Sequence, residues 1–369
     1  MKVLIILLYM LITISFASEN NSIQPTEHKV FFEKEFNQHA YGLLFNAIEH
    51  KQHIYIVGRT AEGRSSTYDT EKPLISKLNQ SGKVIWSKTL KNHFGSFFSI
   101  AIDKHSNIYA VGRDYSPSKK GYRNDIEKAL IIKFNNNGKI IWEKIIGTTK
   151  YDSFHDIKII DDNLYILGIT YSKKEKNQSQ LIKMDFNAAI LFSKILYNNH
   201  DIFYKQHITV DKDKNIYITN NIRSKKPSIS KYSQNGKEIF TKDINTVGLF
   251  QIAIDNDNNL YTISIDTKPN LATNIIKLNN DGNIIWKKNI HLDKKNFPRK
   301  IIINKNTIYI LGKYITIYDT NIFKKSEIKT EIKRINIRNI IATKDNALLI
   351  VGGKGNMPIS DTSYITKIK

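Results

Sequence analysis

A short motif recurs seven times along this chain of 369 residues, and no other feature limits the possible folds as strongly. Each copy sets a tyrosine, or in the last copy a leucine, among apolar residues. The copies are HIYIVG (53–58), NIYAVG (107–112), NLYILG (163–168), NIYITN (215–220), NLYTIS (259–264), TIYILG (307–312) and ALLIVG (347–352). They lie 40 to 56 residues apart, which is the signature of a repeat architecture built from one supersecondary unit.

A second block follows five of the copies and has the pattern of a β-hairpin. Its clearest examples are LISKLNQSGKVIW (74–86), LIIKFNNNGKIIW (130–142), ISKYSQNGKEIF (229–240) and IIKLNNDGNIIW (275–286). The shared glycine suits a tight turn because it adopts positive φ angles without strain. Repeat three has Ala188 in the glycine position, and repeat six shows no clear copy.

The strands of each unit change in character along the chain. The first two, such as FFSIAI (97–102) and IYAV (108–111), are continuously apolar, which indicates burial on both faces. The last, VIWSKTL (84–90), partly alternates, as an outer strand would. Seven such units without helical periodicity predict an all-β fold, a seven-bladed β-propeller of four-stranded blades.

One strand near the amino terminus has no hairpin partner beside it. KVFFEKEF (29–36) aligns without a gap with KVIWSKTL (83–90), and Phe32 falls on Trp86. The chain ends at YITKIK (364–369), where other repeats continue into a turn and a fourth strand. We therefore expect the amino-terminal strand to complete the carboxy-terminal blade and close the ring. An open β-solenoid is the alternative, but it would not need two truncations that add up to one repeat.

The unit that begins at Asp103 and runs through NIYAVGR and LIIKFNNNGKIIWEK resembles the bacterial seven-bladed β-propeller repeat family. It is more distantly similar to the pyrroloquinoline-quinone-like propellers with Gly-x-x-x-Trp hairpins. The resemblance covers residues 28–369 and implies the fold and export. It transfers no functional residue, because such propellers host binding, assembly and enzymatic roles alike. The chain has no cysteine, which excludes an adjacent-cysteine site and a lipidated amino-terminal cysteine.

Residues 1–17, MKVLIILLYMLITISFA, have the pattern of a secretory signal peptide cleaved before Ser18. Residues 18–27 would form a short linker, and residues 28–369 a single propeller domain. We expect a monomer in the periplasm or the medium, without a transmembrane span after cleavage. An uncleaved anchor is the alternative, although a spanning helix needs about 20 apolar residues.

The chain carries 56 Lys and Arg against 34 Asp and Glu, a formal net charge of +22. A basic exported protein suits anionic partners such as lipopolysaccharide, acidic glycans or an envelope protein. We expect no specific nucleic-acid recognition and no cofactor. Because most of the excess is lysine in a chain rich in Ile and Asn, coding bias is an alternative origin of the charge.

Lysines recur at two positions of the repeat. One set lies in the third strand and the other follows the Trp86 position by two residues: Lys77, Lys133, Lys183, Lys231, Lys277 and Lys367, then Lys34, Lys88, Lys144, Lys194, Lys242 and Lys288. Repetition around a ring predicts either basic belts toward the rim or solvated side chains that discourage edge pairing.

Two acidic segments begin like a calcium loop. DKDKN (211–215) and DNDNN (255–259) place oxygen ligands at alternate positions, but neither has glycine at the sixth position. Asp and Asn also favour turns through local side-chain hydrogen bonds. We therefore expect turns between the first and second strands at these places, and no metal site.

The longest connections follow the second strands of repeats one and two, GRTAEGRSSTYDTEKP (58–73) and GRDYSPSKKGYRNDIEK (112–128). Long loops on a rigid scaffold often carry function. The candidate ligand-binding residues are Arg59, Arg64, Tyr68, Arg113, Tyr115, Tyr122 and Arg123, which could clamp an anionic or sugar ligand. Tolerated insertion is the alternative. Our hypothesis is a non-catalytic exported propeller that binds a protein or an anionic glycan on this face.

An enzyme is the second hypothesis. A lyase or hydrolase acting on a polysaccharide or glycopeptide would place its acid and base near the central channel. The nearest carboxylates in the sequence are Asp69, Glu71, Asp114, Asp125 and Glu127, and no spacing singles out a pair. Catalytic residues therefore stay unassigned, and an envelope scaffold without a ligand is a third hypothesis.

Overall fold

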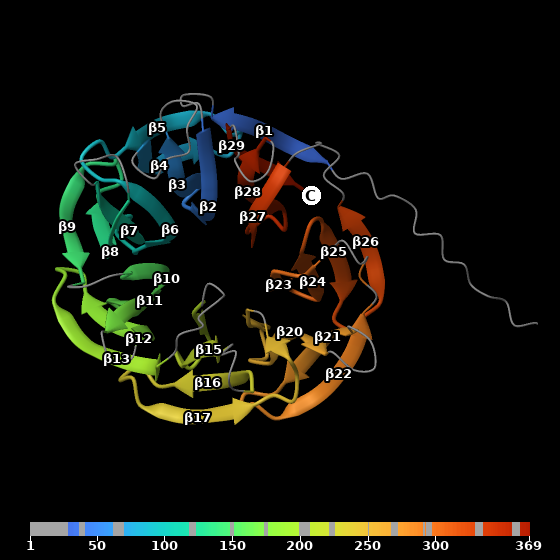
Figure 1. Cartoon of the computed structure of the whole chain (residues 1–369). Helices are drawn as coiled ribbons and strands as arrows, with labels where there is room; N and C mark the ends of the chain where they lie inside the picture. The colour runs from blue at the N-terminus through green and yellow to red at the C-terminus, as the bar shows by residue number, and fades with distance from the viewer. Residues whose placement is uncertain are drawn as a thin grey trace, which may run out of the picture.

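Seven antiparallel sheets stand in a ring around one axis in the computed structural model (Figure 1). The structure describes residues 29–36, 41–61, 70–117, 123–147, 151–172, 176–198, 207–220, 226–249, 251–266, 272–290, 292, 297–328, 335–355 and 362–369. In each sheet the strands follow one another outward from the axis to the rim. The predicted all-β, seven-bladed propeller is confirmed. Within these ranges, no helix is long and apolar enough to cross a bilayer.

The first four blades follow the chain without a break in order. They comprise β2 (Tyr41–His50), β3 (His53–Ala61), β4 (Glu71–Asn79) and β5 (Val84–Thr89); β6 (Gly95–Ile102), β7 (Ile108–Pro117), β8 (Arg123–Phe134) and β9 (Ile140–Ile146); β10 (Ser153–Ile160), β11 (Asn163–Ser172), β12 (Lys176–Asp185) and β13 (Ile190–Asn198); and β14 (Thr209–Val210), β15 (Ile216–Asn220), β16 (Ser228–Tyr232) and β17 (Glu238–Asp243).

The last three blades have the same layout, except that the innermost strand of the fifth is described in two pieces. They comprise β18 (Gly248–Leu249), β19 (Ala253–Ile254), β20 (Leu260–Asp266), β21 (Ala272–Leu278) and β22 (Ile284–Ile290); β23 (Lys300–Asn304), β24 (Thr307–Leu311), β25 (Ile315–Asp319) and β26 (Lys324–Ile328); and β27 (Ile335–Ala342), β28 (Leu348–Lys354), β29 (Thr362–Ile368) and β1 (Val30–Phe36).

The amino-terminal strand closes the ring as expected. β1 pairs with β29, the last strand of the chain, with Phe32 opposite Lys367. The pairing continues beyond both strands, because Lys29 and Lys369 exchange two backbone hydrogen bonds of 2.9 Å. In Figure 1, β1 lies on the rim beside β29 and adjoins the first blade. The two ends of the chain thus share one sheet.

The outer hairpins show how the turns tolerate sequence change. Gly82 has a φ of 77°, and Ala188 holds the equivalent place in repeat three at 71°. The sixth blade, for which the sequence showed no hairpin, also has one between β25 and β26, with Ile322 at a φ of 70°. The sequence pattern did not reveal this turn because a β-branched residue stands where other hairpins have glycine. Such a residue is strained at positive φ.

Five of the seven junctions between blades share one kind of polar contact in the described part of the chain. The Tyr55 hydroxyl and the Lys77 ammonium donate to Asn136 Oδ1, over 2.7 and 2.8 Å, and the Trp86 indole donates to the Asn136 carbonyl over 3.2 Å. Asn136 lies in the outer hairpin of the following blade. Equivalent bonds reach the hairpin turns of four other blades, through Lys133 and Trp142 to Phe186, Tyr165 to Gln234, Tyr217 and Lys231 to Asn280, and Lys367 to Gln80.

The third-strand lysines therefore do not form solvated belts, and that expectation was wrong. Lys77, Lys133, Lys231 and Lys367 are buried, because the next hairpin covers the face on which they lie. Lys77 also lies over the Tyr55 ring, 5.4 Å from the centroid, as do its equivalents over theirs in the next four blades. These lysines fasten blades together rather than form a basic rim.

Substituting Asn136 by Ala should destabilise the protein by about 2–3 kcal/mol, because the Tyr55 hydroxyl and the Lys77 ammonium lose their shared acceptor. Urea unfolding followed by circular dichroism measures the change. The matched control is Asn137→Ala, one residue further along the same turn and exposed. Equal stability of the two variants would show that the contact contributes nothing between blades.

Candidate functional site

The innermost strands of four blades each carry a β-bulge close to the same height. The register against the second strand shifts between Leu44 and Asn46, Phe97 and Ser99, Phe154 and Asp156, and Ile337 and Asn339. The extra residues are Phe45, Phe98, His155 and Arg338. A bulge turns its side chain out of the regular alternation, so these four residues are aimed differently from the core residues around them.

The glycine that ends the repeated motif is what permits the bulge. A Cβ atom on Gly58 would lie 2.1 Å from the Leu43 carbonyl oxygen, and one on Gly112 would lie 1.9 Å from that of Ser96. Both distances are far below van der Waals contact, so the second strand can approach the bulged strand only through glycine. The motif therefore encodes the bulge as well as the strand.

The bulge residues of neighbouring blades touch one another at the axis. The Phe45 and Phe98 rings meet edge to face with centroids 5.2 Å apart, and the Phe98 and His155 rings do so at 6.0 Å. Arg59 lies over the Phe45 ring at 5.8 Å, and Arg113 lies over the Phe98 ring at 5.1 Å. Aromatic and guanidinium groups from three blades thus form one surface.

Two of the predicted binding arginines hold carboxylates of their own blades. Arg59 Nη1 lies 2.5 Å from Glu71 Oε1, and Arg113 Nη1 lies 3.0 Å from Glu127 Oε1. Tyr115 is buried beneath Arg113, whose guanidinium is 4.8 Å from the ring centroid. These pairs fix both arginines in place and neutralise their charge, so they position the surface rather than supply its excess charge.

Sequence reasoning missed two other arginines at this place. Arg299 precedes β23 and Arg338 is the bulge residue of β27, and both side chains are exposed. Partial shielding from water lowers the pKa of Arg338, and the like charges of Arg299 and Arg59 lower it further. Within the described part of the chain, neither Arg299 nor Arg338 forms an ion pair with a carboxylate. We call Phe45, Phe98, His155, Arg59, Arg113, Arg299 and Arg338 the axial cluster.

The remaining predicted site residues cannot be placed in the cluster. Arg64, Tyr68 and Tyr122 lie outside the described residues. For Arg123 the backbone belongs to β8, but its side chain is outside the description.

The prediction of long loops over 58–73 and 112–128 was wrong in part, because β3 runs to Ala61, β4 begins at Glu71, β7 runs to Pro117 and β8 begins at Arg123. Arg59, Arg113 and Tyr115 therefore lie on strands.

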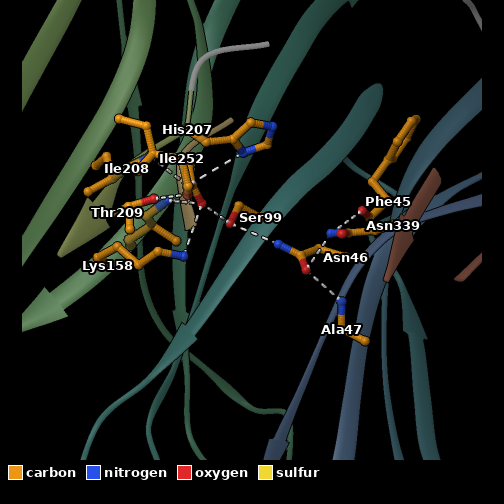
Figure 2. A network of polar contacts seen from close by, with 12 residues as sticks. Phe45, Asn46, Ala47, Ser99, Lys158, His207, Ile208, Thr209, Ile252 and Asn339 are labelled. Atoms are coloured by element: carbon orange, nitrogen blue, oxygen red, sulfur yellow. Dashed lines mark hydrogen bonds and ion pairs between the residues drawn. The ribbon is translucent and has the colours of Figure 1, made fainter. Parts of the chain in front are cut away.

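A chain of polar side chains lies next to the bulges on the innermost strands (Figure 2). Lys300 Nζ donates to Asn339 Oδ1, and Asn339 Nδ2 donates to Asn46 Oδ1 over 2.9 Å. Asn46 Nδ2 donates to Ser99 Oγ over 3.1 Å, and Ser99 donates to Asp156 Oδ1 over 2.7 Å. Every bond points the same way, from an ammonium to a carboxylate across five blades. We call these five residues the polar ring.

Asp156 is the end of this chain and the most heavily bonded of its members. Its carboxylate accepts from the backbone amides of Ile157 and Ile208, over 2.9 and 3.0 Å, in addition to Ser99. Burial alone would raise the pKa of Asp156, but Lys158, His207 and Ser99 together hold it below its usual range. The carboxylate therefore stays ionised inside the protein.

The charged neighbours of Asp156 are also shifted. Burial lowers the pKa of Lys300 to about 8, an effect that the charge of Lys158 reinforces and Asp156 opposes. Burial likewise lowers the pKa of His207, and the Asp156 carboxylate does not fully restore it. The axis thus holds a neutral imidazole and an amine that titrates closer to neutrality than an ordinary lysine.

The other candidate residues of the sequence have structural partners. Asp211 and Asp255 each begin a turn, as expected: the Asp211 carboxylate accepts from the Asn215 backbone and side chain and from Tyr217, and Asp255 binds Asn259 in the same way. No described group of three His, Asp or Glu residues could hold a metal ion.

The carboxylates proposed for catalysis are engaged or lie outside the description. Glu71 and Glu127 bind the two arginines, and Asp114 lies 2.9 Å from His93 Nδ1 and accepts from the Phe94 amide. Asp69 and the side chain of Asp125 are outside the described residues.

Comparison with known proteins supports the fold and little beyond it. No protein-family model matches the sequence. An uncharacterized protein of Aquifex aeolicus (strain VF5) is 25% identical over 158 residues, which is 43% of this chain and 41% of that protein. The match therefore spans about two fifths of the length of its relative. The WD40 β-propeller domain of Doa1 superposes with a TM-score of 0.56 at 10% identity, over 93% of this chain and 97% of that one.

Proposed function

We propose that this propeller is an exported binding protein that takes an acidic glycan of the cell envelope at the axial cluster. The single observation that carries the proposal is the crowding of Arg299 and Arg338 beside Arg59, where no described carboxylate pairs with either of them. Like charges held together are unfavourable until an anion binds between them. The leader at residues 1–17 supports export to a compartment where such polymers occur.

The groups around these arginines suit a carbohydrate acid. Arginine offers a planar fork of donors that matches a carboxylate or sulfate group. The half-buried Phe45 ring lies beside this charge and presents an apolar surface of the kind against which sugar rings pack. The Arg59–Glu71 and Arg113–Glu127 pairs hold that surface rigid, which limits the entropy lost on binding.

Replacing Arg299 and Arg338 together by Ala should weaken binding to polygalacturonate, a polymer of uronic acids, by roughly a hundredfold, about tenfold for each charged hydrogen-bonding group. Isothermal titration calorimetry at 0.15 M salt measures the loss. The matched control is Lys237→Ala with Lys305→Ala, which removes the same charge from exposed sites in turns at the opposite ends of the strands. Equal losses in the two double variants would mean that net charge, not this cluster, binds the polymer.

A polysaccharide-cleaving enzyme is the second candidate, and the shifted groups at the axis favour it. An amine with a pKa of about 8 can act as a general base. The contacts of Ser99 argue against nucleophilic catalysis, because Ser99 donates to Asp156 and not to His207, so the imidazole cannot take its proton. Release of unsaturated or reducing ends from the same polymer, abolished by Lys300→Met, would establish the enzyme.

A further inference from the structure

The outer strands carry a regular row of exposed apolar side chains that the fold does not need. In six blades the residue just before the Trp86 position is a large apolar one with 43% to 53% of its surface exposed. These residues are Phe31, Ile85, Ile141, Leu191, Ile239 and Ile285, which we call the apolar ring. In the sixth blade the sequence places Lys325 there. Single exposed apolar residues are common, but one in the same position of six blades is not.

All six side chains leave the disc on the same side. The outer strands follow the circumference of the propeller (Figure 1), so the two faces of each outer strand look along the axis to the two sides of the disc. Each member of the apolar ring is the extra residue of a β-bulge, because the register shifts between the residues before and after it. The six side chains therefore hold equivalent places around the propeller. The side with Trp86 is covered by the next hairpin, where a Cβ on Gly138 would lie 3.2 Å from the Trp86 ring. Ile85 and its equivalents are about half exposed, so that hairpin does not cover them and the apolar ring lies on the open side. This side is spatially separate from the axial cluster.

Lysines accompany the apolar ring on that side. Lys29, Lys83, Lys139 and Lys237 each stand two residues before a ring member, and all four are exposed. Four of the six apolar side chains therefore have a lysine close by in the sequence, and Lys29 Nζ lies 5.4 Å from the centroid of the Phe31 ring. Glu33 and Glu143, two residues after ring members, are the exposed carboxylates in the corresponding place. This side of the disc therefore presents six separate apolar side chains, four of which have a lysine two residues before them.

The spacing of these apolar side chains and lysines determines which kind of partner can cover this side of the disc. A second copy would bring the same four lysines face to face, which is unfavourable. A protein partner needs a continuous apolar centre, whereas these residues are one blade apart around a circle. A planar surface with negative charge and an apolar interior can contact all of them together. We infer that this side of the disc docks onto the surface of an anionic lipid bilayer, with the apolar ring inserted among the acyl chains and the lysines at the phosphates.

Sedimentation with lipid vesicles tests the inference on the chain from Ser18, which retains every described strand. We expect binding to vesicles of equal parts phosphatidylglycerol and phosphatidylcholine at 0.15 M salt, and much weaker binding to phosphatidylcholine alone. Ile141→Asp with Ile285→Asp should lower the partition coefficient by roughly a hundredfold, about tenfold for each buried side chain replaced by a charge.

The matched control is Val247→Asp with Phe297→Asp. These residues are 59% and 53% exposed and lie in the segments that lead into innermost strands, away from the apolar ring. The control should bind vesicles like the wild type, and so should the Arg299→Ala, Arg338→Ala variant. Equal losses in the two Asp variants, or no binding of the wild type to the anionic vesicles, would overturn the inference.

Discussion

Deleting residues 29–36 should leave a chain that does not fold stably, the largest effect we expect from any change of this size. The deletion removes β1 and with it the outer strand of the seventh blade. It exposes the edge of β29 and empties the place of Phe32, which is buried between the seventh and first blades. Because a typical domain is stable by only about 5–15 kcal/mol, losing a whole strand at the closure is expected to exceed that margin.

Substitutions at two adjacent positions of β1 distinguish the contribution of side-chain packing from that of the strand itself. Phe32→Ala should cost about 3–5 kcal/mol, since it empties a buried site, whereas Phe31→Ala at the exposed neighbouring position should change stability by about 0.5 kcal/mol or less. Denaturant unfolding of both variants measures the difference. If the deletion variant unfolds with the same midpoint as the wild type, closure by β1 is not what holds the two ends together.

The sequence is enough to predict that β1 closes the ring, because this prediction depends on the spacing of repeated residues. The interval from the Trp86 position to the next tyrosine is 23 residues in several repeats, and the same interval follows Phe32. The segment around Phe32 therefore matches the fourth strand that the last repeat lacks. Hairpin turns were predictable where glycine supplies the positive φ, and not in the sixth blade, where Ile322 bears it at the cost of strain.

Contacts between blades could not be predicted from the repeat pattern alone. In the sequence, Lys77 has the alternating position of a solvent-exposed residue in a strand near the rim. The packed structure shows instead that the hairpin of the next blade covers it. The axial cluster could not be predicted from the repeat pattern either. The pattern indicates that Phe45 is a core residue, and Arg338 lies 293 residues further along the chain. The signal that could have located it is Gly58 with its equivalents, since a glycine closing a buried strand indicates close approach of a neighbouring strand.

The polar ring joins blades at the axis as the hairpin contacts join them at the rim. Its links run from the sixth blade through the seventh, first and second to the third, and Asp156 carries them to the fourth through the Ile208 amide. Thr209 adds a bond of 2.7 Å to the Ile252 carbonyl of the fifth blade. An innermost strand has few apolar neighbours across the axis, so these bonds supply cohesion where packing is weakest.

Replacing Asp156 by Ala should therefore cost about 3–5 kcal/mol at pH 7. The substitution leaves the Ser99 hydroxyl and the buried Ile208 amide without an acceptor, and it removes the carboxylate between Lys158 and His207. Urea unfolding at pH 7 gives the value. The control is Asp161→Ala, an exposed aspartate paired with Lys214 on the surface, for which about 1 kcal/mol or less is expected.

The same carboxylate gives the effect a pH dependence of known sign. Because the folded pKa of Asp156 lies below its usual value, its contribution is fully present above about pH 4 and is lost as the pH falls toward the folded pKa. The stability difference between the wild type and Asp156→Asn should thus be constant from pH 7 to pH 5 and shrink below pH 4, since the amide does not titrate. A difference that stays constant down to pH 2.5 would mean that the ionised carboxylate is not what holds the ring, and that the amide hydrogen bonds alone account for its stability.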